Sequence, residues 1–76
     1  MPDNLPDMRP VQSRNAAAVG YDAESQEFYV EWHAGKTSVY SSVPANVAAD
    51  VQNAPSVGQA VHQILKPTYQ HRYLSE

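Results

Sequence analysis

The sequence predicts an α+β domain: an antiparallel β-meander of three strands, or four with an N-terminal edge strand, with two C-terminal helices packed on one face. Two observations lead to this prediction. Apolar and polar side chains alternate through the middle of the chain, as in a strand with one buried face. After Pro44 the apolar spacing lengthens to about three and a half residues, the period of a helix that buries one side.

The central strand is the clearest element. Across residues 28–33, Phe28, Val30 and Trp32 alternate with more polar neighbours, so these three should face the core. A preceding strand is expected over 16–21. The polar run at 22–27 has no large apolar side chain to bury, so it is interpreted as the loop that connects the two strands.

The loop after Trp32 decides which face Tyr40 occupies, because a shift of one residue moves every side chain to the other side of the sheet. A two-residue loop would place Tyr40 opposite Tyr29 on the outer face. A three-residue loop with Gly35 as a bulge would place Tyr40 beside Phe28 on the inner face. The Ala-Gly pair at this turn is not the Asn-Gly signature of a two-residue loop, so the sequence favours the inner position.

Two helices are expected next. Serines 41 and 42 precede Pro44, a combination typical of a helix start, and Pro55 should end this first helix near Asn53. Ser56, with Gln59 three residues later, resembles a capping box for a second helix that ends at Pro67. Its core-facing stripe should consist of Val57, Ala60, Val61, Ile64 and Leu65.

The two ends of the chain carry weaker signals. Residues 1–9 are aperiodic with two prolines, so we expect a flexible leader, followed by a single domain over 10–70 and a C-terminal tail over 71–76. Val11 and Ser13 are candidates to begin the edge strand, where Pro10 would cost no ladder hydrogen bond. Tyr69 is expected to pack back onto the sheet.

Composition limits the possible functions. The chain lacks cysteine, so neither a disulfide nor a thiolate zinc site is available. We also expect no metal or other cofactor, because His33, His62 and His71 are irregularly spaced. Without an apolar stretch long enough for a signal peptide or membrane span, a cytoplasmic location is the default expectation. No Gly-x-Ser-x-Gly elbow is present, and we expect a protein that is not an enzyme.

The ordered set of motifs resembles the KTSC domain, a small domain at the C-terminal end of some lysyl-tRNA synthetases that also occurs as stand-alone bacterial and phage proteins. The resemblance covers residues 11–69. It rests on Val11 with Ser13, Val19-Gly20-Tyr21-Asp22, Phe28-x-Val30-x-Trp32, Gly35, Tyr40, Val43-Pro44, Ala54-x-Ser56-x-Gly58, and Ile64 with Tyr69. The family pattern has a Tyr-x-Tyr pair in the third strand, where this chain has Ser38 and Tyr40.

A noncatalytic binding module follows as the leading hypothesis. The resemblance implies an association with RNA through the tRNA synthetases, although a net charge of −3 is a poor general match for phosphate. The C-terminal third is locally positive, with Lys66 and Arg72. Tyrosines beside basic residues can stack bases, but strand tyrosines are more often core residues. The candidate surface comprises Tyr29, Lys36, Tyr40, Lys66, Tyr69, His71, Arg72 and Tyr73.

Two alternatives to RNA stay open. The first is a protein-interaction or inhibitor domain that uses Tyr29, Val39 and the sheet edge to add a strand to a partner, which suits the acidic balance. The second is a homodimer formed through the same exposed face.

Overall fold

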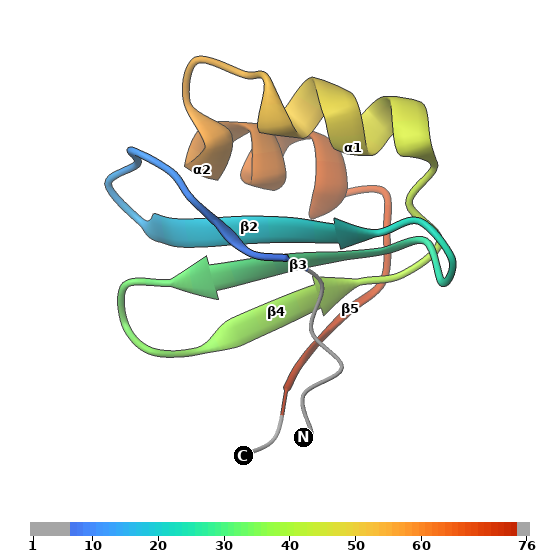
Figure 1. Cartoon of the computed structure of the whole chain (residues 1–76), viewed down its shortest axis with the longest axis horizontal. Helices are drawn as coiled ribbons and strands as arrows, with labels where there is room; N and C mark the ends of the chain where they lie inside the picture. The colour runs from blue at the N-terminus through green and yellow to red at the C-terminus, as the bar shows by residue number, and fades with distance from the viewer. Residues whose placement is uncertain (1–6, 75–76) are drawn as a thin grey trace.

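Five antiparallel strands form one sheet, and the helices cover one of its faces (Figure 1). The computed structural model describes residues 7–74. The strands follow the chain in their order across the sheet: β1 (Arg9–Pro10), β2 (Ala16–Asp22), β3 (Glu27–Trp32), β4 (Thr37–Tyr40) and β5 (His71–Tyr73). The helices α1 (Ala45–Gln52), α2 (Val57–Ala60) and the π-helix η1 (Val61–Leu65) lie between β4 and β5 in the chain. The α+β class is confirmed, but the sheet is larger than the three or four strands predicted.

The β3–β4 hairpin adopts the bulged register favoured by the sequence. Tyr40 lies opposite Phe28, and Val39 lies opposite Tyr29. The amide of Trp32 donates to the carbonyl of Lys36 at 2.8 Å, which leaves three residues in the loop. Gly35 has a φ of 100°, a value that costs little without a Cβ atom. Tyr40 therefore faces the helix-covered side, called here the helix face.

The sheet edges differ most from the prediction. The N-terminal edge strand exists but lies at Arg9–Pro10, earlier than predicted, so part of the expected leader pairs with β2. The first six residues of that leader lie outside the described part. At the other edge, residues 71–73 pair with β4 instead of fraying as a tail, with His71 opposite Tyr40. Three residues are too few to show an alternation of apolar and polar side chains, so the sequence pattern does not predict this strand. Its strand geometry depends on pairing with β4.

A β-bulge in β2 sets which of its side chains are buried. The register against β3 shifts between Ala16 and Ala18. Ala16 and Val19 are three positions apart, which would place them on opposite faces of a regular strand, yet both belong to the core. The extra residue, Ala17, accepts a hydrogen bond from the amide of Val11 at 3.0 Å.

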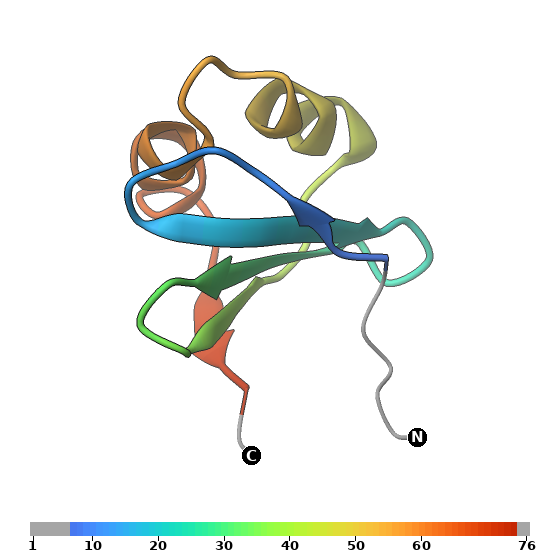
Figure 2. The ribbon, with the colours of Figure 1, turned by 60° about the vertical axis from the view of Figure 1, so that its left-hand side comes forward.

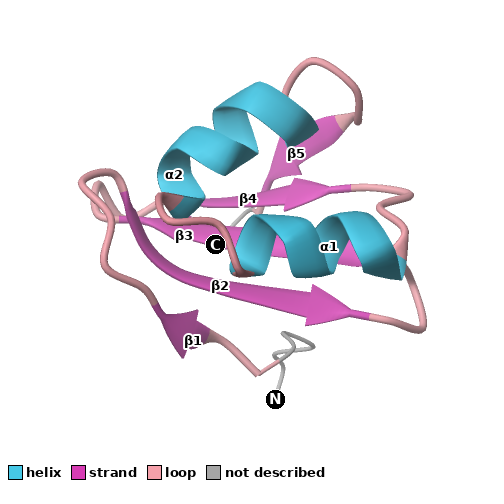
Figure 3. Cartoon of the chain, turned by 90° about the horizontal axis from the view of Figure 1, so that it is seen from above, coloured by secondary structure: helices cyan, strands magenta, loops and turns pink. Residues whose placement is uncertain are grey.

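Viewed from above, α1 lies over β2 and β3, and the helix formed by α2 and η1 lies toward β4 (Figure 3). The predicted end of α1 is confirmed, since Asn53 caps it. Its predicted start is wrong in one detail: Pro44 is the N-cap, without a side-chain hydrogen bond, and Ser42 lies in a left-handed turn at φ 59°. Ser56 caps α2 as predicted, its hydroxyl accepting from the amide of Gln59 at 3.4 Å.

The predicted apolar stripe of the second helix is correct except for Ile64. Val61 and Leu65 are fully buried, whereas Ile64 is 36% exposed. The helix widens there into a π turn, in which the amide of Lys66 donates to the carbonyl of Val61 at 2.9 Å. This hydrogen bond joins residues five apart instead of four, so the turn contains an extra residue and Ile64 rotates away from the sheet. A pattern based on 3.6 residues per turn cannot anticipate this rotation.

The outer face of the sheet is not the hydrated surface that the sequence predicts. Tyr29 is 6% exposed and Val39 is fully buried, although both point away from the helices. Glu27 of β3 forms an ion pair with Arg72 of β5, and this contact crosses over β4, which lies between them. The protein-partner hypothesis therefore loses the two side chains on which it relied.

Candidate functional site

A groove opens on the helix face where the helices stop short of the last strand. It lies between η1 on one side and β5 on the other, with β4 beneath, and has a volume of about 460 Å³. Figure 2 shows β5 extending away from the helices beyond β4. The residues that line the groove are Arg14, Asn15, Trp32, His33, Ala34, Lys36, Ser38, Tyr40, His62, Lys66, His71 and Tyr73.

Aromatic side chains form the floor and one wall of the groove. The ring of Tyr40 stacks on His71 with the ring centres 5.1 Å apart, and His71 meets Tyr73 edge-on at 5.3 Å. The indole Nε1 of Trp32 donates to the hydroxyl of Ser38 at 2.8 Å, which fixes the orientation of the indole. The alternation of each strand puts these residues on one face, and pairing of β4 with β5 brings them together.

Cationic side chains surround these rings. The Nζ atom of Lys36 lies 5.3 Å from the centre of the Tyr73 ring, within the range of a cation–π contact. Lys66 follows η1 on the opposite side, and Arg14 approaches from the loop before β2. His62 lies 6.0 Å from Trp32, ring centre to ring centre. This arrangement suits a ligand that has both a flat ring and negative charge.

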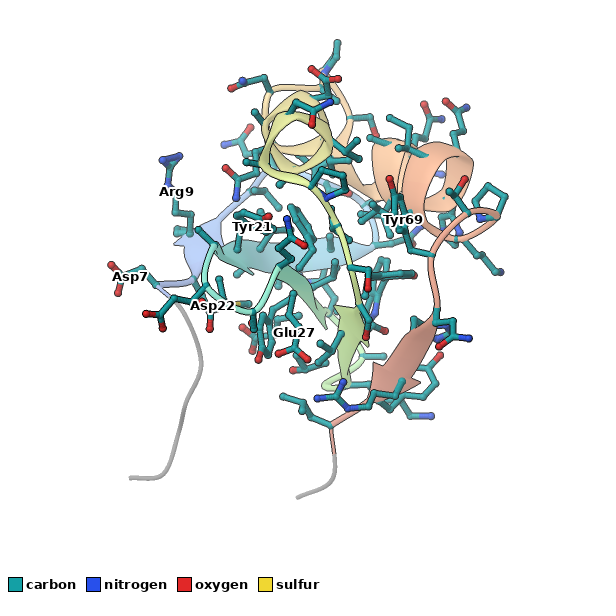
Figure 4. The ribbon with its side chains drawn as sticks, turned by 90° about the vertical axis from the view of Figure 1, so that its right-hand side faces the viewer. Asp7, Arg9, Tyr21, Asp22, Glu27 and Tyr69 are labelled. Carbon is teal, nitrogen blue, oxygen red and sulfur yellow. The ribbon has the colours of Figure 1, made fainter. Side chains whose placement is uncertain are left out.

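The charges of the protein are segregated around this groove. The chain has a net charge of −3, but none of the lining residues is acidic. Figure 4 shows Asp7, Asp22 and Glu27 at the end of the sheet that carries the β2–β3 turn. In that turn the carboxylate of Asp22 accepts hydrogen bonds from the amides of Glu24 and Ser25, at 3.0 and 3.4 Å. An anionic ligand would be attracted to the groove and repelled from the turn.

The groove brings together five of the eight residues proposed from the sequence: Lys36, Tyr40, Lys66, His71 and Tyr73. The other three lie elsewhere. Tyr69 packs against the core, as predicted, and lies at the same end as Tyr21 (Figure 4). Tyr29 and Arg72 are on the outer face.

Tyr29 and Arg72 share a partner on that outer face. The Tyr29 hydroxyl donates to Oε1 of Glu27 at 3.0 Å, and Nη2 of Arg72 lies 3.5 Å from Oε2 of the same carboxylate. Burial of the Tyr29 ring raises the pKa of its hydroxyl, and the adjacent Glu27 raises it further. Both residues are thus engaged in packing and pairing within the protein.

Sequence reasoning missed several residues of the groove. Trp32 was predicted as a core residue, and it does pack on the core, but one part of it also borders the groove. His62 lies outside the apolar stripe predicted for the second helix, and it is exposed. Arg14 carries no periodic signal at all. These residues become neighbours only once β5 is known to extend the sheet beyond the helices.

The described part of the chain gives no indication of two other features, a metal-ion site and a membrane-spanning helix. Over residues 7–74, no three His, Asp or Glu side chains are grouped so that they could hold a metal ion. None of the helices in the same range has the length and apolar character to cross a membrane.

Comparison with known proteins places the chain in a family. Residues 12–69 match the family model of the KTSC domain. The chain belongs to the KTSC domain family. The resemblance seen in the sequence is thereby confirmed.

Three further proteins are similar to most of this chain. A protein of Tsukamurella paurometabola is 37% identical over 62 residues, covering 82% of this chain and 92% of the relative. A protein of Stutzerimonas stutzeri is 35% identical, covering 83% of this chain and 87% of the relative. The crystal structure of a KTSC domain protein from Yersinia pestis superposes with a TM-score of 0.83 at 23% identity, covering 91% of this chain and 97% of the other. That structure supports the fold.

A lysine–tRNA ligase of Trichormus variabilis is also similar, with 33% identity over 55 residues. The match covers 72% of this chain but only 10% of the ligase. The KTSC domain is therefore a small module that occurs within a much larger enzyme as well as in proteins of about its own size.

Proposed function

We propose that this KTSC domain is a noncatalytic module that binds single-stranded RNA in the groove. The observation that carries this proposal is the composition of the groove in a protein of net charge −3. Its lining contains three tyrosine or tryptophan rings, three histidines and three Lys or Arg residues, and no carboxylate.

Each component has a role in holding a single strand. Bases stack on aromatic side chains with a contribution of about 1 to 3 kcal/mol per base, and Tyr73, 56% exposed, presents an accessible ring. Lys36, Lys66 and Arg14 can neutralise phosphates on either side of such a base. A duplex would not fit this role, because its bases are already stacked and paired.

The family assignment adds an association with RNA. The ligases that share this module are named for lysine and tRNA. The match covers a tenth of each ligase. It therefore links the module to an enzyme that handles RNA, and it does not identify which part of that enzyme contacts the RNA.

Titration of a fluorescein-labelled octauridylate with the protein, followed by fluorescence anisotropy, tests this proposal. We expect binding at about 50 mM salt that weakens as salt is raised. Lys66→Glu should weaken it, because the cation lies at the groove. Arg9→Glu makes the same change in charge in β1, at the opposite edge of the sheet, and should have little effect (Figure 4).

Trp32 provides a second readout in the same experiment. It is the single tryptophan of the chain and it lines the groove, so its fluorescence should change when unlabelled octauridylate binds. Wild-type protein that does not retain the oligonucleotide at low salt would refute the proposal. Binding that Arg9→Glu weakens as much as Lys66→Glu would also refute it, since the interaction would then be with the overall charge.

A protein partner is the alternative outcome. With Tyr29 and Val39 buried, such a partner would pair with the backbone of an edge strand, and the exposed strand β5 is one candidate. An affinity pull-down with and without nuclease separates the cases: a partner that survives nuclease argues for protein, and one that vanishes argues for RNA. Light scattering at two concentrations tests for a second copy of the chain.

A further inference from the structure

Tyr40 has an unusual position among the tyrosines of this protein. The side chain is only 3% exposed and belongs to the core, yet it also lines the groove. One face of its ring is taken by His71, at 5.1 Å between ring centres and 23° between the planes. Tyr40 therefore has little free ring surface to offer a stacked base.

The hydroxyl of Tyr40 is the part of this residue left without a partner. The hydroxyl of Tyr21 donates to the carbonyl of Val43, and that of Tyr29 donates to Glu27. Within residues 7–74, the Tyr40 hydroxyl makes no comparable hydrogen bond. All fully buried side-chain nitrogen and oxygen atoms in that range are paired, so the Tyr40 hydroxyl must reach open space, and the open space beside Tyr40 is the groove.

This hydroxyl is available as a hydrogen-bond donor at neutral pH. Burial raises the pKa of Tyr40, and the nearby Tyr73 raises it further, so the group stays protonated. Because this donor opens on the groove and has no acceptor within the described residues, a ligand in the groove can supply one.

The dimensions of the groove limit what that ligand can be. A volume of about 460 Å³ falls within the range of roughly 300 to 1,000 Å³ usual for sites that hold one small molecule. A single nucleotide turned out of its strand has a free base edge with carbonyl or ring-nitrogen acceptors. Its phosphates would meet Lys36 and Lys66 at the rim.

We propose that the groove holds one nucleotide that is turned out of its strand, and that the Tyr40 hydroxyl donates a hydrogen bond to the edge of its base. This inference rests on the proposed function and adds the recognition step to it. Stacking and charge come from Tyr73, Trp32 and the cations, whereas Tyr40 distinguishes a base from a bare sugar-phosphate chain.

Tyr40→Phe removes only the hydroxyl, and two RNA probes separate its effects. With octauridylate, Tyr40→Phe should bind about 3- to 10-fold more weakly than wild type, the usual range for one hydrogen bond between neutral groups. With an octamer of abasic ribose phosphates, which has no base edge, the two proteins should bind equally. Tyr29→Phe makes the same change on the outer face and should match wild type on both probes.

Stability of the free protein distinguishes a ligand contact from a structural role. Tyr40→Phe loses no hydrogen bond within the described residues, so its thermal midpoint should equal or exceed that of wild type. Tyr29→Phe loses the contact with Glu27 and should unfold at a lower temperature.

The inference is overturned if Tyr40→Phe binds octauridylate as wild type does, or if it loses affinity equally for the abasic octamer. In both cases the proposed function stands, provided that wild type binds octauridylate and Lys66→Glu weakens it. If wild type does not bind octauridylate at all, the proposed function fails and this inference fails with it.

Discussion

At the scale of single residues, Ser38 shapes the floor of the groove. It lies two residues before Tyr40 in β4, so both side chains point to the helix face. Here the position is 1% exposed and the small hydroxyl accepts a hydrogen bond from Trp32. A tyrosine ring in the same place would project toward the groove. Serine therefore leaves room at the floor that a larger residue would fill.

Ser38→Ala should destabilise the protein by about 1 kcal/mol, because the indole N–H of Trp32 loses its acceptor in a partly buried setting. Urea unfolding followed by circular dichroism measures this change. The fluorescence of Trp32 should also shift, since the ring is freer to move. Ser41→Ala, a change at a partly exposed serine, serves as the control and should leave both measurements near wild type.

At the scale of secondary structure, local patterns predicted the centre of the sheet and tertiary contacts determined its borders. Alternation located β3, and the absence of an Asn-Gly turn indicated the register that places Tyr40 beside Phe28. β5 is different, because three residues acquire strand geometry only by pairing with β4. The bulge at Ala17 and the π turn before Lys66 likewise arise from packing, and neither has a sequence signature of its own.

The loop before β2 is fitted closely against the start of α2 (Figures 1 and 2). A Cβ atom added to Gly58 would lie 2.6 Å from the hydroxyl oxygen of Ser13, too close for van der Waals contact. That hydroxyl accepts a hydrogen bond from the amide of Ala16 at 3.4 Å, so moving it disturbs the entry to β2. Gly58 is therefore required by the neighbouring loop, not by its own backbone conformation.

Gly58→Ala should have a less favourable effect on the free energy of unfolding in the wild-type protein than in a Ser13→Ala background. Alanine favours a helix over glycine by about 1 kcal/mol, so once the Ser13 hydroxyl is gone the substitution should be neutral or stabilising. A double-mutant cycle from urea unfolding of the four proteins gives the coupling energy. Additive effects of the two substitutions would contradict the close approach of these side chains.

At the scale of the whole molecule, the candidate site depends on how the helices sit on the sheet. The sequence identified an aromatic and basic surface near the C-terminus, and five of its eight residues do meet in the groove. Alternation put Tyr29 on the outer face, but the sequence could not show that Arg72 lies there too, because the face of Arg72 depends on the pairing of β5. Nor could it bring Arg14 and Trp32 to the same place, since that contact follows from the assembled fold.

Burial of Tyr29 and Tyr40 predicts a loss of stability at alkaline pH. Their pKa values are raised in the folded state, whereas tyrosines of the unfolded chain ionise near pH 10. The full contribution is present below about pH 10 and declines as the pH rises from there through the folded-state pKa, since the unfolded state then holds fewer protons. Free energies of unfolding measured between about pH 8 and 11 should fall more steeply for wild type than for a Tyr29→Phe/Tyr40→Phe double variant. Parallel curves would contradict this.

The segregation of charge predicts a definite salt dependence of RNA binding. For a single strand, the logarithm of the binding constant falls by about 0.7 per tenfold rise in salt for each phosphate that a cation neutralises. The groove has three Lys or Arg residues, so the slope of log binding constant against log salt concentration should be no steeper than about −2 for wild type. Lys66→Ala should reduce the slope by about 0.7, because one contact is removed, and Arg9→Ala should leave it unchanged. A slope far steeper than −2, or one that Lys66→Ala does not alter, would mean that phosphates lie on some other surface of the domain.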